Sequence, residues 1–243
     1  MRRTLRRAVC LRGRGLFSGR PCAVRVLPAA AGSGWQWRVA RRWHRLSPAH
    51  AAPLPHRARL RADGDELVLP EHLLAALVIA DVDDVAIEVP SGEVPILDGS
   101  SLPFAQALRH AGCRADSTAL DVSVTFEGRT ARWTGGWGPT QARTFIDLGT
   151  ARAQRALFRG ADASTALVRD GAHRALGARG HRLSHEPAWH KLVDLLGDLG
   201  PWRALGPLRG RIHARNPSHD RTPDQIRRWL ADGSLRHTLS LAA

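Results

Sequence analysis

Apolar and polar residues alternate in two segments near the start of the chain, a pattern typical of half-buried strands. The first segment is CAVRVLPA at residues 22–29, and the second is GSGWQWRVA at residues 32–40. We expect the second strand to pair with the first as a hairpin. Residues 44–66 are rich in proline, histidine and arginine and predict a loop.

Helical spacing begins at Pro70, where a proline suits the first turn and the leucines after it recur on a helical period. The segment EHLLAALVIA therefore predicts a helix over residues 70–80. The rest of the first half predicts a strand at 83–90, a turn-rich loop at 91–101 and a helix at 102–112 that Gly112 ends.

The second half repeats this mixture of patterns. It predicts strands at 119–128, 141–148 and 209–217, a short strand and a Gly-rich turn in TARWTGGWGPT at 130–140, and a helix with loops at 150–185. EPAWHKLVDLLGDLG is predicted to form a helix from Glu186 to a stop at Gly200-Pro201. Residues 222–233 predict another helix, with Thr222 as N-cap and Pro223 in its first turn. We therefore predict an α+β protein with two domains, residues 1–115 and 116–243.

Composition agrees with a folded chain, because 43% apolar residues among 243 exclude a disordered protein. The net charge of +14 is uneven: residues 1–62 hold 15 arginines and no acid. With Trp35, Trp37 and Trp43 between arginines, this basic N-terminal quarter could bind phosphates or contact an anionic membrane surface peripherally. A solvated surface is the simpler interpretation, and no nucleic-acid partner is expected, because no nucleic-acid fold signature accompanies the charge.

Cysteine usage and hydropathy bear on the compartment. Cys10, Cys22 and Cys113 are odd in number and lack CxxC spacing, so they indicate neither a disulfide framework nor a cysteine-only zinc site. The basic start lacks the apolar core of a signal peptide, and the longest apolar run, residues 73–80, is too short to span a bilayer. We expect a cytoplasmic protein.

Candidate chemistry lies on the helix predicted after Glu186. His190, Asp194 and Asp198 follow one another at i, i+4 and i+8, so they project from one side and two of them can hold one metal ion. His72, which directly follows Glu71, is a natural third ligand. Three protein ligands and one open position define a catalytic zinc site. By itself, such spacing on an amphipathic helix more often belongs to a surface pair.

Five segments, in order, resemble the UDP-3-O-acyl-N-acetylglucosamine deacetylases, zinc amidases of lipid A (lipopolysaccharide) biosynthesis. RTLRRAVCLRGRGLFSG resembles the family's opening strand and G-x-G-L-H-T-G turn. The segment at 70–108 resembles V-E-H-L-x-A-A-L and the E-x-P-I-x-D-G-S-x-x-P-F run. ARTF, HKLVDLLGDL and NPSH match its A-R-T-F, H-K-x-x-D-x-x-G-D-L and late S-G-H motifs. The resemblance implies two β-α-α-β domains packed helix layer to helix layer, with the active site between them.

The resemblance also implies the residues of the metal site. His72, His190 and Asp194 would hold Zn2+ as the cofactor. Glu71 would act as general base on the metal-activated water, a task suited to a carboxylate beside the metal. The implied substrate is a UDP-linked, 3-O-acylated N-acetyl sugar, and the implied protein is a monomer.

Five further residues have implied roles in catalysis and substrate binding. His219 would stay protonated, stabilise the oxyanion and protonate the leaving amine, and Asp198 would support its imidazolium. Thr144 would donate a hydrogen bond to the oxyanion. Phe145 would line the sugar and acyl region, and Lys191 would contact substrate oxygens.

The chain also departs from the family pattern. Residues 113–143 are about half as long as in the family, which predicts a shortened second domain. Phe17 and Ser18 replace the His-Thr of the opening turn, and we expect a packing change there. Ser218 replaces a glycine, and Asp220 follows, so both could alter the placement or the pKa of His219.

The sequence therefore does not decide whether the substrate is the acylated UDP-sugar of the family. Residues 150–185, which correspond to the family's acyl passage, are rich in arginine and poor in large apolar residues. A shortened relative that deacetylates another N-acetyl sugar is one alternative, and a non-catalytic phosphate-binding relative is another. Lys191 bears on the choice: it is the one lysine in a chain of 35 arginines, and we interpret it as aimed at the substrate.

Overall fold

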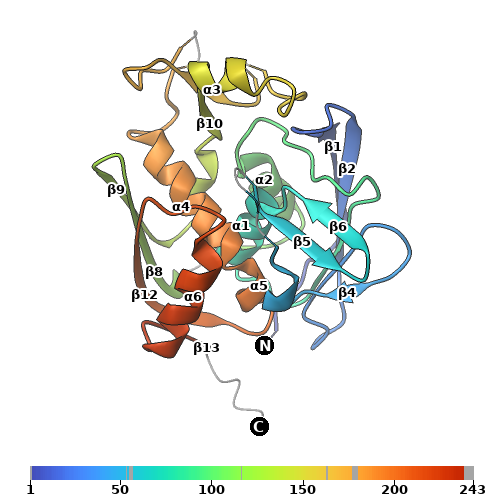
Figure 1. Ribbon diagram of the computed structural model, residues 1–243. Helices are drawn as coiled ribbons and strands as arrows, with labels where there is room; N and C mark the ends of the chain where they lie inside the picture. The colour runs from blue at the N-terminus through green and yellow to red at the C-terminus, as the bar shows by residue number, and fades with distance from the viewer. Residues whose placement is uncertain are drawn as a thin grey trace.

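The structure is a computed structural model that describes residues 2–52, 54, 57–115, 117–162, 164–176 and 180–237. Within these residues, one sheet has the order β1-β2-β7-β3-β4 and a second has the order β13-β12-β8-β9. Figure 1 shows the two sheets on opposite sides of the molecule, with helices α1 and α4 between them. The α+β fold class predicted from the sequence is confirmed.

The first half contains the first sheet, a small hairpin and two helices. Its elements are β1 (Val9–Arg14), β2 (Pro21–Pro28), β3 (Trp35–Arg38), β4 (His44–Arg45), the 3-10 helix η1 (Pro48–His50), β5 (Arg59–Ala62), β6 (Asp65–Val68), α1 (Glu71–Ile79), β7 (Val85–Glu88) and α2 (Leu102–His110). Gly112 follows α2 with a φ of 90°, the left-handed conformation that ends many helices.

Two expectations for this half are wrong. The strands at 22–29 and 32–40 do form, as β2 and β3, but they are not hairpin partners, because β7 lies between them and pairs antiparallel with β2 and parallel with β3. The predicted loop at 44–66 contains the hairpin of β5 and β6. Its turn is Asp63-Gly64, both with positive φ, which is the signal for a two-residue hairpin turn.

The second half contributes the second sheet and the longest helix. Its elements are β8 (Ser117–Phe126), β9 (Arg129–Gly135), the 3-10 helix η2 (Gly138–Gln141), β10 (Phe145–Asp147), α3 (Leu148–Ala153), β11 (Leu167–Arg169), α4 (Glu186–Asp198), α5 (Gly200–Arg203), β12 (Leu208–Arg215), α6 (Thr222–Ala231) and β13 (Leu235–His237). β8 and β12 pair in parallel, and β10 and β11 form a separate parallel pair.

Helix ends in this half differ from the prediction in two details. Thr222 is the first residue of α6 and not its N-cap; its hydroxyl donates to the carbonyl of Ser218 at 2.9 Å. Gly200-Pro201 ends α4 as expected, but the chain continues directly into the short helix α5. A proline lacks the backbone N–H that would be unpaired in a first turn anyway, so it can start a helix as well as stop one.

The hydrophobic core lies between the sheets, where α1 packs against α4. Every residue of α1 is buried, so this helix has no solvent-facing side. Gly197 allows α4 to approach α1 closely: a Cβ built there would lie 2.3 Å from the backbone oxygen of Glu71. The helices therefore meet at the residues that carry the candidate chemistry. The domain boundary at 115/116 stays a prediction.

The tryptophans of the basic N-terminal quarter do not form the phosphate-binding surface considered above. Trp35 and Trp37 are fully buried in the first sheet, and Trp43, 36% exposed, lies under the guanidinium of Arg38. Indole burial therefore explains two of the three residues as core packing. Among the described residues, none of the helices combines the length and apolarity needed to cross a bilayer.

Candidate metal centre and active site

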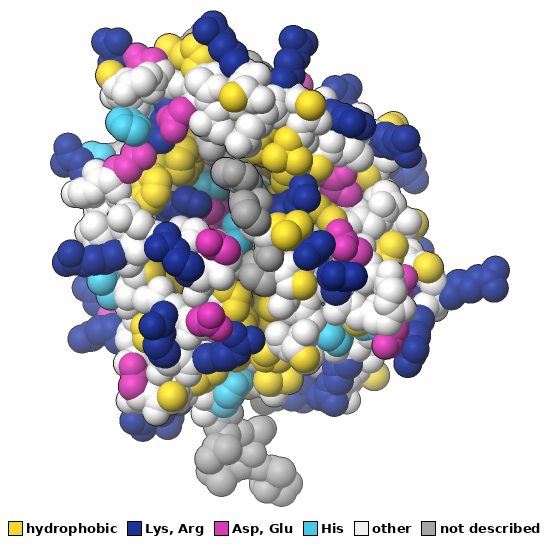
Figure 2. All heavy atoms as spheres, viewed as in Figure 1, with side chains coloured by type: hydrophobic (Ala, Val, Ile, Leu, Met, Phe, Trp, Pro, Cys, Tyr) yellow, Lys and Arg dark blue, Asp and Glu magenta, His cyan; other side chains and the backbone are white. Residues whose placement is uncertain are grey.

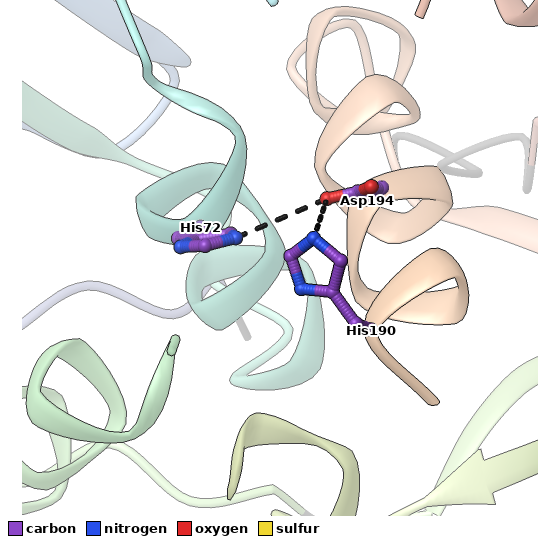
Figure 3. Close-up of side chains that lie close together, drawn as sticks. All are labelled: His72, His190 and Asp194. Carbon is purple, nitrogen blue, oxygen red and sulfur yellow. Dashed lines mark ion pairs between the residues drawn. The ribbon is translucent and has the colours of Figure 1, made fainter. Parts of the chain in front are cut away.

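Three of the predicted ligands lie together where α1 meets α4. His72 stands in the first turn of α1, and His190 and Asp194 lie one turn apart on α4 (Figure 3). Asp194 Oδ1 is 3.3 Å from His190 Nε2 and 3.9 Å from His72 Nε2. Each residue offers one ligand atom, and these three atoms all lie within 4.8 Å of one another, so they can converge on one ion.

The donor set fits zinc. His72, His190 and Asp194 are all buried, and among the described residues His190 Nδ1 has no hydrogen-bond partner. Burial lowers the pKa of both imidazoles, that of His190 to about 3, so both keep the neutral form that binds a metal. Burial would raise the pKa of Asp194, but His190 and Lys191 hold it well below its usual range. Two imidazoles and one carboxylate are ordinary zinc ligands.

Glu71 lies beside this group on α1 and is almost completely buried. Its Oε2 has no hydrogen-bond partner among the described residues. Burial raises its pKa to about 7; the charges of Asp194 and Asp198 act in the same direction, and that of His219 opposes them. A carboxyl group with a pKa near neutrality is suited to accept a proton in one step and release it in another.

His219 completes the polar end of the site from the loop before α6. Its Nδ1 lies 2.8 Å from Asp198 Oδ1, and its Nε2 lies 3.9 Å from both Glu71 Oε1 and Asp194 Oδ2. Burial alone would lower the pKa of His219, but the carboxylates of Asp198, Asp194 and Glu71 raise it to about 10. At neutral pH this histidine is therefore an imidazolium that can donate from Nε2.

Ser218 does not prevent this placement. The residue with positive φ in the loop is Asn216, at 45°, and Ser218 is not among the positive-φ residues. Asn adopts the left-handed region more readily than most residues, so the turn is made three positions before His219 without a glycine. Asp220 is exposed, and the main charges that raise the pKa of His219 come from Asp198, Asp194 and Glu71.

Thr144, Phe145 and Lys191 line the same pocket, whose volume is about 290 Å³. Lys191 Nζ lies 3.1 Å from Asp194 Oδ2 and 5.8 Å from the centroid of the Phe145 ring. The Phe145 and His190 rings lie nearly perpendicular to each other, with their centroids 5.6 Å apart. The structure thus places all nine sequence-predicted site residues around one cavity or, for Asp198, directly behind it on His219.

Two features of the site were missed. One is a buried ion pair behind the pocket: Arg143 donates from Nε and Nη2 to Glu186 at 2.9 and 3.0 Å, and both side chains are almost inaccessible. Arg143 was visible in the ARTF motif, and Glu186 opens the ligand helix. No local pattern could have paired them, because 42 residues separate them along the chain.

The other missed feature is the apolar lining. Segment 150–185 supplies Phe158, Ala161 and Ala166, and further large apolar side chains come from Leu16, Leu69 and Ile146. The composition of segment 150–185 therefore does not by itself decide how apolar the pocket is. These residues belong to three distant segments, and local periodicity carries no signal for such a meeting.

Charge on the outside of the molecule is mixed. Figure 2 shows Lys and Arg side chains around the whole face, with Asp and Glu between them. Several arginines of the N-terminal quarter pair with acids from later in the chain: Arg2 with Asp84, and Arg25 and Arg38 with Glu88. The excess charge of that quarter is therefore partly neutralised on folding.

Fold and site together define a class: an α+β protein with a buried His/His/Asp group, a carboxyl and an imidazolium at one pocket. The family model for LpxC, UDP-3-O-acyl N-acetylglycosamine deacetylase, matches residues 2–131 and 140–230. The chain belongs to this family.

Similar proteins agree with this assignment. The chain is 28% identical to the bifunctional enzyme LpxC/FabZ of Chlorobaculum tepidum, over 89% of this chain and 61% of that protein. It is 32% identical to the UDP-3-O-acyl-N-acetylglucosamine deacetylase of Nitratidesulfovibrio vulgaris, over 49% of this chain and 40% of that protein. It is 31% identical to the enzyme of the same name from Synechocystis, over 82% of this chain and 88% of that protein. The chain thus spans less than two thirds of the first two relatives.

Proposed function

We propose that the protein is a zinc-dependent amidohydrolase that removes the acetyl group from a UDP-linked, 3-O-acylated N-acetylglucosamine, a step of lipid A biosynthesis. The observation that carries the proposal is the convergence of His72, His190 and Asp194 beside Glu71 and His219 in one pocket. Family membership and the names of the relatives supply the substrate.

His72, His190 and Asp194 would hold the zinc ion, which when bound polarises the amide and activates water as a nucleophile. Glu71, with its raised pKa and unpaired oxygen, accepts the proton of the attacking water. His219 donates from Nε2, first as a hydrogen bond to the developing oxyanion and then as a proton to the leaving amine.

The other residues hold this machinery and the substrate. Asp198 keeps the imidazole of His219 oriented and charged through the 2.8 Å contact. The Thr144 hydroxyl is the second donor to the oxyanion. Phe145 and Lys191 bind the sugar-nucleotide, the ring through apolar contact and the ammonium through its charge.

The remaining parts of the proposal concern place and partners. A cytoplasmic location is supported by three cysteines that stay free thiols. A monomeric state and a peripheral contact between the basic quarter and an anionic membrane stay predictions.

The decisive experiment measures acetate released by zinc-loaded protein from UDP-3-O-acyl-N-acetylglucosamine and from its unacylated counterpart. We expect turnover of the acylated sugar, and a loss of about 10²- to 10⁴-fold in Glu71→Gln with zinc content unchanged. Turnover of the unacylated sugar alone would reject the acylated substrate and favour a deacetylase of another N-acetyl sugar. Zinc-loaded protein inactive on both, with steeply salt-dependent binding of polyanions, would favour the phosphate-binding alternative.

A further inference from the structure

One end of the pocket belongs to a small apolar cluster that is separate from the main core. Leu16, Leu69 and Ile96 are its buried members, and the half-buried side chains packed against them are those of Phe17, Val68, Phe158 and Ala161. Of these, Leu16, Leu69, Phe158 and Ala161 line the pocket that holds Glu71 and the metal ligands. The pocket therefore has a reactive polar part and an apolar part.

Behind the apolar part stands a stack of three side chains. Phe158 lines the pocket, its ring centroid is 5.7 Å from that of Phe17, and the Arg57 guanidinium lies 4.3 Å over the Phe17 ring. On the far side, Phe17, Arg57 and Val68 line an open surface groove. Two packed rings, Phe158 on the pocket side and Phe17 on the groove side, therefore separate the pocket from this groove.

Backbone hydrogen bonds fix this layer in place. The N–H groups of Phe17 and Ser18 donate to the buried carboxylate of Glu93 at 2.8 and 3.2 Å. Gly160 donates to the carbonyl of Leu16 at 2.9 Å, and a Cβ at Gly160 would lie 2.0 Å from the Gly15 oxygen. The turn that carries Phe17 is thus bound to the segment that carries Phe158, and the wall cannot swing away freely.

We propose that Phe17 is a specificity-determining residue: it holds Phe158 in place as the end wall of the apolar part of the pocket and so limits the acyl chain of the substrate to a short one. This inference rests on the proposed function. A pocket of about 290 Å³ is at the lower end of the ~300–1,000 Å³ typical of small-molecule sites, so it holds the reacting end of the sugar and little more. A longer chain would meet the Phe158 ring, which Phe17 supports from behind, and would gain nothing from its additional methylenes.

The test compares binding of UDP-3-O-acyl-N-acetylglucosamines of increasing acyl length by titration calorimetry, in a Glu71→Gln background that does not consume them. With Phe17 present, the affinity should stop rising once the acyl chain is longer than a few carbons. Phe17→Ala should move that limit to longer chains, with about a fourfold gain for each further methylene that becomes buried. Acetate release along the same series, without the Glu71 change, should show the same displacement in kcat/KM.

Leu11→Ala is the matched control, because it removes a half-buried apolar side chain packed on the main core in β1, away from the pocket. It should leave the length profile unchanged. If Phe17→Ala does not fold, Phe17→Leu opens the wall partly and decides the question. An identical length profile in a folded Phe17 variant would overturn the inference. If binding depends on acyl length but no substrate of the series releases acetate, the proposed function is rejected, while the inference about Phe17 still holds.

Discussion

Lys191 is the one lysine in a chain with 35 arginines, and its ammonium group lies against Asp194 in the candidate site. Its Nζ contacts Asp194 Oδ2 at 3.1 Å and lies 6.0 and 5.8 Å from the Phe126 and Phe145 rings. Lysine places a compact charge on a flexible stem, whereas a guanidinium is planar and forked. The space between the two rings and Asp194, a proposed metal ligand, thus holds the more compact cation, which contacts Oδ2 of that carboxylate.

Lys191→Arg should therefore lower kcat/KM about tenfold or more, which corresponds to ~1.4 kcal/mol of lost transition-state stabilisation. Zinc content and the thermal midpoint should stay at wild-type values, because His72, His190 and Asp194 are unchanged. Steady-state kinetics together with metal analysis check this. Wild-type activity in the variant would mean that the lone lysine is an accident of composition.

The packing of α4 on α1 depends on a residue without a side chain. A Cβ at Gly197 would lie 2.3 Å from the oxygen and 2.8 Å from the Cα of Glu71, and backbone atoms cannot give way as a flexible side chain can. This close approach brings the first turn of α1, with Glu71 and His72, to the face of α4 that carries His190 and Asp194.

Gly197→Ala should separate the two helices and cost at least ~2 kcal/mol of unfolding free energy, in the range of overpacked cores. Because the ligands lie on both helices, zinc affinity should fall too. Gly149→Ala is the control: Gly149 is also helical, in α3, and nothing lies within 4 Å of its added Cβ. Urea unfolding and zinc titration of the two variants measure the contrast, and equal stability of both would contradict the packing argument.

The start of α4 is held by the Arg143–Glu186 pair. Burial would raise the pKa of Glu186, but hydrogen bonds from Arg143 and the backbone N–H groups of Arg143 and Arg182 hold it below its usual value of 4.5. The folded pKa is thus lower than the unfolded one. The ionised carboxylate contributes stability above pH 4.5, and this contribution is lost as the pH falls through the folded pKa.

Glu186→Gln leaves Arg143 buried without its counter-ion and should cost about 3–5 kcal/mol at pH 7. The difference in unfolding free energy from wild type should shrink once the pH falls below about 4.5, where the wild-type carboxylate begins to lose its advantage. Denaturant unfolding at pH 7 and at pH 3.5 measures both values. A difference that is independent of pH would rule out the carboxylate charge as its origin.

The proposed metal centre would join the two halves of the molecule. His72 comes from α1 in the first half, and His190 and Asp194 come from α4 in the second (Figure 1). An ion bound by both helices is present in the folded state and has no assembled site in the unfolded chain, so its binding energy adds to stability.

Removing zinc with a chelator should lower the thermal midpoint. At a free zinc concentration of 100 Kd the ion contributes ~2.7 kcal/mol, which is on the order of 5–10 °C for a chain of this size. His190→Ala should bind substoichiometric zinc and have a midpoint that the chelator does not move. Differential scanning calorimetry with metal analysis checks this, and full zinc retention by His190→Ala would overturn the ligand assignment.

Local patterns predicted most elements correctly and failed where pairing is non-local. α1, α4, β2, β7 and β12 form where periodicity placed them, because each buries one face or a whole apolar run. The pairing of β3 with β7 was missed, since the partners Trp35 and Val85 are 50 positions apart and strand alternation says nothing about neighbours. The β5–β6 hairpin was missed although its Asp63-Gly64 turn was visible in the sequence.

The sequence by itself determined the residue types and helical spacings of the site: His190 and Asp194 share one face of a helix wherever that helix lies. Tertiary structure alone decided that His72 meets them, that His219 reaches Asp198, and that Glu71 is buried enough for its pKa to rise to about 7. It also decided that Phe17 packs against Phe158, which lines the apolar end of the pocket. These contacts join distant segments, and their distances and dielectric environment exist only once the two helices and two sheets have packed.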